Sequence, residues 1–299
     1  MIPLTKATTV ALPARGLFPL LSCVRAGEVL ALQGSPLLGA LFAMGHPTVA
    51  RCVPLALLAA GSTLLTAHVF VLNDWSGIRG DLHDPNRRGG VFTNRGIERK
   101  TVLYLSLALL LAGLLLLSLF GSPTLTIALA IAGLSALYSF PRVHLKGVPV
   151  LGSALHFVGG LLQFLLGYSV GAAPDWRGMQ IGSFFALVFV AGHLTHETRD
   201  SDSDRLNGIR TNAVTFGKMR SFLTGLALFI VADVLLMVLA LCNVAPRPLA
   251  LVVLLVPLHI YWSLEAIRAG LTFASIQRLQ LRYRTFYAAT GLCMAAVVL

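Results

Sequence analysis

Nine mostly apolar stretches, each about as long as a bilayer is thick, limit this chain to a small choice of folds. A helix that crosses a bilayer needs about 20 mostly apolar residues. Such stretches lie at residues 27–46, 52–73, 101–120, 123–141, 150–172, 179–196, 220–242, 248–267 and 283–299, and the first is interrupted by Gln33-Gly34-Ser35-Pro36. None shows the period-two alternation of a membrane β-barrel. The sequence therefore predicts an all-α polytopic membrane protein, a bundle of about nine transmembrane helices.

Basic residues are distributed unevenly between the two ends of these predicted spans. Of 23 Lys and Arg residues, 20 fall in the N-terminal segment and in the loops after the second, fourth, sixth and eighth spans. The other loops contain only Arg51, Arg177 and Arg247. Because basic loops stay in the cytoplasm, we expect an integral protein of the cell or inner membrane with its N-terminus inside and its C-terminus outside. Residues 1–24 are then a cytosolic lead-in, and residues 25–299 form the membrane domain.

The composition narrows the possible partners to a lipid bilayer and small molecules. Only 12% of the residues are charged, about half the share of a soluble domain. The net charge of +11 comes from cations scattered singly among apolar stretches. The basic face with interleaved aromatic residues that is typical of nucleic-acid binding is not present in the sequence. The four cysteines lie far apart and predict neither a disulfide framework nor a zinc site.

Two short polar stretches, residues 73–84 and 197–204, each follow a predicted span and together hold seven of the twelve acidic residues. These seven are Asp74, Asp81, Asp84, Glu197, Asp200, Asp202 and Asp204. Charged groups at the edge of a bilayer are costly unless they are paired, solvated or bound to metal. We therefore expect the two stretches to form facing halves of one divalent-metal site in a cytoplasm-facing cavity.

The spacing of the acidic residues suits one face of a helix, on which residues three, four or seven apart are neighbours. In the first stretch this applies to Asp74, Asp81 and Asp84, although Gly77 and Gly80 weaken helical continuity there. In the second stretch it applies to residues 197, 200 and 204, whereas residue 202 points elsewhere.

Clustered carboxylates repel one another unless a cation lies between them, and an oxygen-only set suits Mg²⁺, which typically also binds waters and substrate phosphates. Two such clusters suit a diphosphate bridged by metal ions. Nearby cations that could balance its charge are Arg87, Arg88, Lys146, Arg199 and Arg210. The plainer interpretation is a pair of solvated, charged loops at the membrane surface.

Four short motifs along the chain carry a family resemblance. Asn73-Asp74 followed by Asp81 is similar to the N-D-x-x-D-x-x-x-D motif of the UbiA superfamily of intramembrane prenyltransferases. Three further segments resemble the family: residues 197–204, the tail Gly208-Ile209-Arg210-Thr211 with Gly217, and Tyr138-Ser139-x-Pro141 with Leu145-Lys146. The resemblance extends from about residue 25 to the C-terminus. It implies a nine-helix bundle in which two Mg²⁺ ions hold a prenyl diphosphate.

The resemblance also implies roles for individual residues. The metal ligands and catalytic residues would be Asp74, Asp81, Asp200 and Asp204, with Asn73 and Glu197 joining or orienting them. The substrate-binding residues would be Lys146, Arg199, Arg210 and Tyr138. Arg88 is a further candidate because it is a cation near the first acidic stretch. His156, seven residues before Gln163 in the fifth span, is a candidate for acceptor recognition. The family's middle aspartate falls on Gly77, and residues 87–91 lack its usual Arg-Pro pair. Either Asp84 compensates as a further ligand, or the first metal ion is held weakly and the activity is reduced, altered or lost.

These observations predict Mg²⁺-dependent transfer of a prenyl group from a prenyl diphosphate to an acceptor, which the resemblance makes an aromatic or other lipophilic molecule. Two alternatives stay open at this point. One is a terpene cyclase of the same family, and the other is a membrane transporter or binding bundle without enzymatic activity. Transporters usually place ionisable residues near mid-membrane, whereas these acidic residues lie at one edge. The edge position favours the enzyme.

Overall fold

The computed structural model describes residues 20, 22–45, 48–84, 88–140 and 145–299, without the side chain of Arg79, and in this part of the chain every regular element is a helix. The α-helices are α2 (Ala26–Leu32), α3 (Gly34–Met44), α4 (Val49–His83), α5 (Arg99–Ser118), α6 (Ser122–Ser139), α7 (Leu151–Gly171), α8 (Trp176–Leu206), α9 (Asn212–Phe216), α10 (Lys218–Leu241), α11 (Val256–Arg268) and α12 (Phe273–Val298). Short 3₁₀ turns are η1 (Arg88–Gly90), η2 (Phe92–Arg95), η3 (Leu145–Gly147) and η4 (Arg247–Leu255). The predicted all-α fold is confirmed.

Eight helical segments within the described residues are long and apolar enough to cross a membrane, and they coincide with the first eight predicted spans. The ninth predicted span, residues 283–299, falls within α12, which begins ten residues earlier, at Phe273. Arg278, Arg282 and Arg284 make the first half of this helix polar. The count of nine membrane spans therefore stays a prediction, although α12 packs inside the bundle against α3 and α8.

The interrupted first span is two helices joined at Gln33, which is buried. The Gln33 Nε2 donates hydrogen bonds to the Val29 carbonyl (2.9 Å) and to the Thr66 hydroxyl (3.4 Å). The Ser62 hydroxyl on α4 donates to the Gln33 Oε1 at 2.6 Å. These partners satisfy an amide that would otherwise be costly to bury at this depth, and they attach the joint between α2 and α3 to α4.

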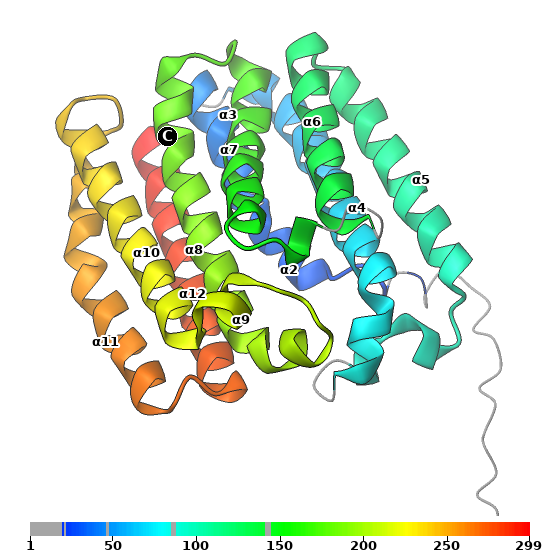
Figure 1. The fold of residues 1–299 in the computed structure, drawn as a ribbon. Coiled ribbons are helices and arrows are strands. Elements are labelled where there is room, and N and C mark those ends of the chain that lie inside the picture. Colours follow the sequence, from blue (N-terminus) through cyan, green and yellow to red (C-terminus); the bar gives the residue numbers. More distant parts are fainter. Residues whose placement is uncertain (1–19, 21, 46–47, 85–87, 141–144) are drawn as a thin grey trace, which may run out of the picture.

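Small residues let neighbouring helices approach closely, as is common in membrane bundles. A Cβ atom at Gly167 of α7 would overlap the carbonyl oxygen of Pro36 on α3, and one at Gly39 of α3 would overlap the carbonyl oxygen of Phe164. In Figure 1, α7 and α8 lie in the middle of the bundle, with α10 and α11 on one side and α5 and α6 on the other.

Helix α8 begins at an N-cap, Asp175, whose carboxylate accepts the Gly178 N–H at 2.7 Å. This hydrogen bond to the charged form holds the pKa of the Asp175 carboxyl below its ordinary value. The helix is 31 residues long, and α4 is 35 residues long. Each contains its predicted apolar span and continues beyond the end of that span. Gly77 and Gly80 do not interrupt α4, and both acidic stretches are therefore continuations of membrane-spanning helices.

Candidate active site

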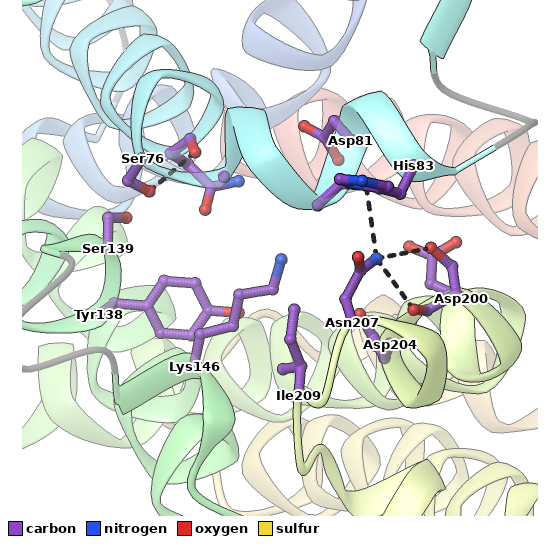
Figure 2. A pocket seen from close by; sticks show the side chains of 14 residues that line it. Ser76, Asp81, His83, Tyr138, Ser139, Lys146, Asp200, Asp204, Asn207 and Ile209 are labelled. Atoms are coloured by element: carbon purple, nitrogen blue, oxygen red, sulfur yellow. Dashed lines mark hydrogen bonds between the residues drawn. The ribbon is translucent and has the colours of Figure 1, made fainter.

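The C-terminal turns of α4 and α8 face each other across a cavity of about 290 Å³ that η3 and the end of α6 complete (Figure 2). The lining residues are Asn73, Ser76, Gly77, Gly80, Asp81, His83, Tyr138, Ser139, Lys146, Asp200, Ser203, Asp204, Asn207 and Ile209. Residues more than a hundred positions apart thus meet in one site. Six of the sequence-predicted site residues are among them, including three of the four predicted catalytic aspartates.

The wall formed by α4 presents Asn73, Gly77 and Asp81, which are spaced by four and therefore lie on one face of the helix. Asp81 is the one carboxylate that α4 adds to the described lining. The neighbouring Ser76 hydroxyl donates to the Asn73 carbonyl at 2.9 Å. A Cβ atom at Gly77 would meet only the Asp81 Oδ2, at 3.7 Å, so this wall has open space where the family motif has its middle aspartate.

The wall formed by α8 presents Asp200, Ser203, Asp204 and Asn207, again residues that share one helical face. Sequence reasoning missed Asn207, although its position seven residues after Asp200 was a usable signal. The Asn207 Nδ2 donates to the Ser203 carbonyl (3.0 Å) and to the Gly80 carbonyl of α4 (3.4 Å), so it connects the two walls.

Arg199 sits beside the cavity and not in its lining. Its Nε donates to the Asp200 Oδ1 at 2.7 Å, and its Nη2 donates to the Asp200 Oδ2 at 2.9 Å. The third guanidinium nitrogen donates to the Gln280 Oε1 of α12 at 2.7 Å, and the group lies over the ring of Phe273. Arg199 therefore orients Asp200 and joins α8 to α12.

Several predicted site residues lie outside the lining. The Asp74 carboxylate is 3.6 Å from the Arg25 guanidinium, and both side chains are about one-third exposed. Asp84 is buried at the residue that follows α4. Arg88 and Arg210 are exposed. Position 87, a further predicted cation, lies outside the described residues.

Glu197 is buried one turn before Asp200 and is engaged with the chain that follows α8. Its Oε2 accepts the backbone N–H (3.0 Å) and the side-chain Nδ2 (2.9 Å) of Asn212. Its Oε1 lies 3.0 Å from the His193 Nε2. Sequence reasoning missed Asn212, because nothing in the sequence connects it with an acidic residue fifteen positions earlier.

His156 packs behind the cavity. Its ring stacks on His193 with centroids 3.6 Å apart. The ring of Tyr138, which lines the cavity, is nearly perpendicular to it, with centroids 4.9 Å apart. The Nδ1 is 2.8 Å from the Gly152 carbonyl, which can only accept a hydrogen bond, so Nδ1 carries the proton. His156 and Gln163 are both absent from the lining.

Within the described part of the chain, no group of three or more His, Cys, Asp or Glu residues is close enough to hold a metal ion by itself. The three lining carboxylates instead lie on opposite walls, with the Lys146 side chain extending between the helices (Figure 2). Such an oxygen-donor set fits Mg²⁺, which usually keeps several waters and is completed by substrate phosphates.

Comparison with known proteins assigns the family. The model of the UbiA prenyltransferase family matches residues 34–271. Digeranylgeranylglyceryl phosphate synthase from Natronomonas pharaonis is 29% identical over 73% of this chain and 75% of its own. The protein of the same name from Methanothrix thermoacetophila is 27% identical, over 72% and 75%.

Solved structures share the fold. A UbiA homologue from Archaeoglobus fulgidus bound to GPP and Mg²⁺ superposes with a TM-score of 0.73 at 16% identity, covering 93% of this chain and 100% of that chain. The apo UbiA homologue from Aeropyrum pernix K1 gives a TM-score of 0.67 at 14% identity, with 92% and 96% covered. The chain thus belongs to the UbiA prenyltransferase family and is an intramembrane prenyltransferase.

Proposed function

We propose that this prenyltransferase uses Mg²⁺ to transfer the prenyl group of a prenyl diphosphate to a lipophilic acceptor. One observation carries the proposal: Asp81 of α4 meets Asp200 and Asp204 of α8 in one cavity, with Lys146 beside them, at the end of a membrane-spanning bundle. Two structural neighbours from Archaeoglobus fulgidus, bound to Mg²⁺ with GPP or DMAPP, support it.

Each group of residues at the cavity has its own role in the proposed reaction. Asp81, Asp200 and Asp204 would hold Mg²⁺, two ions in this proposal, with the Asn73 amide as a further oxygen donor. When bound, Mg²⁺ neutralises the leaving diphosphate so that the allylic C–O bond can break. The Lys146 ammonium donates hydrogen bonds to the diphosphate oxygens. The buried apolar side chains of the bundle keep water from the prenyl cation until the acceptor captures it.

The remaining predicted residues act less directly. Asp74 supports the α4 wall through its ion pair with Arg25. Arg199 holds Asp200, while the exposed Arg88 and Arg210 attract the anionic substrate.

The acceptor can belong to either of two classes. The family resemblance implies an aromatic ring, which loses a proton after alkylation. The two curated relatives are named digeranylgeranylglyceryl phosphate synthase, which favours a lipid glyceryl phosphate whose hydroxyl is alkylated. In both cases the prenyl tail enters from the bilayer, which explains why the site is at the end of a membrane bundle.

The test is mass analysis of products formed by the purified protein in lipid nanodiscs. It is incubated with prenyl diphosphates of several lengths and with a phenolic acceptor, a glyceryl phosphate ether or no acceptor. We expect an alkylated acceptor in one of the first two arms, and only when Mg²⁺ is present. A cyclic hydrocarbon in the third arm would identify a cyclase, and full activity in chelator would exclude the metal mechanism.

We also propose that the cavity opens to the cytoplasm, as the distribution of basic residues predicts. Single cysteines at the exposed positions 82 and 202 should react with an impermeant reagent only from the cytoplasmic side, and one at position 176 only from outside, in a background without native cysteines. Labelling of positions 82 and 202 from the outer face would show that the cavity opens to the outside and would refute the proposed orientation.

A further inference from the structure

We propose that Glu197 and Asn212 are positioning residues that hold a strained turn at Val150 and thereby place Lys146 at the cavity. The inference deepens the proposed function and rests on it for the role of Lys146. Neither residue belongs to the cavity lining, so both would act on the substrate through the segment between η3 and α7.

Val150, immediately before α7, has φ of 65° and ψ of −48°. The Leu151 N–H donates to the Pro149 carbonyl at 2.7 Å, which closes a three-residue γ-turn around Val150. This positive-φ form of the γ-turn is rare and strained, and a β-branched residue is poorly suited to it. The Val150 side chain is 63% exposed, so its packing does not stabilise the conformation.

A buried hydrogen-bond network holds the turn instead. The Val150 N–H donates to the Asn212 Oδ1 at 2.8 Å. The Asn212 Nδ2 donates to the Glu197 Oε2 at 2.9 Å and to the Ser153 hydroxyl at 3.0 Å. Asn212 is 6% exposed and Glu197 5%. Because every side-chain group of Asn212 has a partner, its amide is fixed in one orientation with its oxygen toward Val150.

The turn is connected to Lys146 by a short bonded path. The Gly152 N–H donates to the Val148 carbonyl, and the Val148 N–H donates to the Leu145 carbonyl, each at 3.1 Å. The backbone on either side of Val150 is therefore linked to the residue that precedes Lys146. On the other side, Glu197 is one turn before Asp200 on α8, so the network sets the position of the lysine relative to the α8 carboxylates. Strained backbone persists where surrounding structure enforces it, which is common at functional sites.

The experiment begins with Asn212→Ala. The backbone N–H at 212 still donates to Glu197, so the buried carboxylate keeps one donor. We expect KM for the prenyl diphosphate to rise about tenfold, with kcat changed less than about threefold. We also expect faster hydrogen exchange of amides between 148 and 152. Asn212→Ser, which shortens the side chain but keeps a polar hydroxyl, serves for the same comparison if the alanine variant accumulates poorly.

The decisive variant is Val150→Gly in the Asn212→Ala background. Glycine adopts a positive φ without strain, so the turn should persist without Asn212, and KM should return most of the way to the wild-type value. A residue that only packs the bundle would not be rescued in this way. Ser153→Ala is the matched control, since it removes another partner of the same amide but leaves the bond to the turn, and its KM should stay within about twofold of wild type.

An absent rescue by Val150→Gly, or an unchanged KM in Asn212→Ala despite faster exchange, would overturn the proposal. The proposed function fails separately, through lack of Mg²⁺-dependent transfer by the wild type. Exchange and calorimetric binding of inorganic diphosphate with Mg²⁺ would then still test the network. If Asn212→Ala left the hydrogen exchange of the amides between 148 and 152 unchanged, the proposed role of the network would be refuted.

Discussion

The C-terminal turns of α4 and α8 are alike in backbone and unlike in charge. Each is an unbroken helical extension of a membrane span, and each presents one face to the same cavity. The α8 face carries Asp200 and Asp204 one turn apart, whereas the α4 face carries Asp81 with Gly77 one turn before it. Helical continuity therefore determines which positions line the cavity, and the residue types at those positions determine how many carboxylates each wall carries.

The unequal number of carboxylates on the two walls affects how each substitution should change the proposed metal site. Removal of either α8 carboxylate leaves the other on the same wall. Removal of Asp81 leaves the α4 lining with the amide of Asn73, the hydroxyl of Ser76 and the imidazole of His83, which are weak substitutes for a carboxylate toward Mg²⁺. The single carboxylate should be the more sensitive position.

Asp81→Ala should show the largest loss, about 10³-fold in kcat/KM at fixed Mg²⁺, since a preorganised charge in an active site contributes about 10²–10³-fold. The measurement is steady-state kinetics of purified protein in nanodiscs, with helical content checked by circular dichroism. An Asp81→Ala enzyme that is more active than the α8 variants would refute the inequality of the two walls.

Asp200→Ala and Asp204→Ala should each lose about 10²-fold, at the lower end of the same range. Asp202→Ala is the matched control on the same helix. Its side chain is 82% exposed and paired with Lys218, so kcat/KM should be unchanged. Equal losses at 200, 202 and 204 would indicate a general effect of charge on the helix and not a directed site.

The sequence predicts the outline of this site well. Apolar stretches give the spans, and the acidic residues that follow two of them give the helices that meet. It does not give the rotation of α4, which packing fixes so that Asn73 lines the cavity while Asp74 meets Arg25.

Nonlocal contacts explain the other differences between sequence and structure. Glu197 fits the acidic spacing, yet its carboxylate accepts hydrogen bonds from Asn212, a residue of α9 that folds back against α8. Spacing within one helix carries no information about such a return.

Asp74→Ala should lose less than about tenfold, because a partly exposed ion pair contributes little. Arg25→Ala, which removes the other partner, should have a similar effect. Kinetics of the two single variants and the double variant measure whether they act as one unit. A loss for Asp74→Ala as large as that for Asp81→Ala would place Asp74 on the metal and equalise the two walls.

Gly77→Asp should have the smallest effect and the opposite sign. The open space at this position has only the Asp81 Oδ2 within reach, so an added carboxylate would join Asp81 and make the α4 wall resemble the α8 wall. Paired carboxylates repel one another without a cation and bind one more tightly. The Mg²⁺ concentration for half-maximal rate should therefore fall about threefold to tenfold. Gly89→Asp, at an exposed glycine with nothing near its Cβ position, should leave it unchanged.

The same substitution decides between two roles for Gly77. If Gly77 supplied a bend through which Asp84 reached the metal, Gly77→Asp would lower activity and Asp84→Ala would be as damaging as Asp81→Ala. The helix continues without interruption past Gly77, and Asp84 lies outside the lining, so we expect Asp84→Ala to change the Mg²⁺ requirement little. The double variant Gly77→Asp/Asp81→Ala moves the carboxylate by one turn, and partial recovery over Asp81→Ala would show that the α4 wall needs charge more than it needs residue 81.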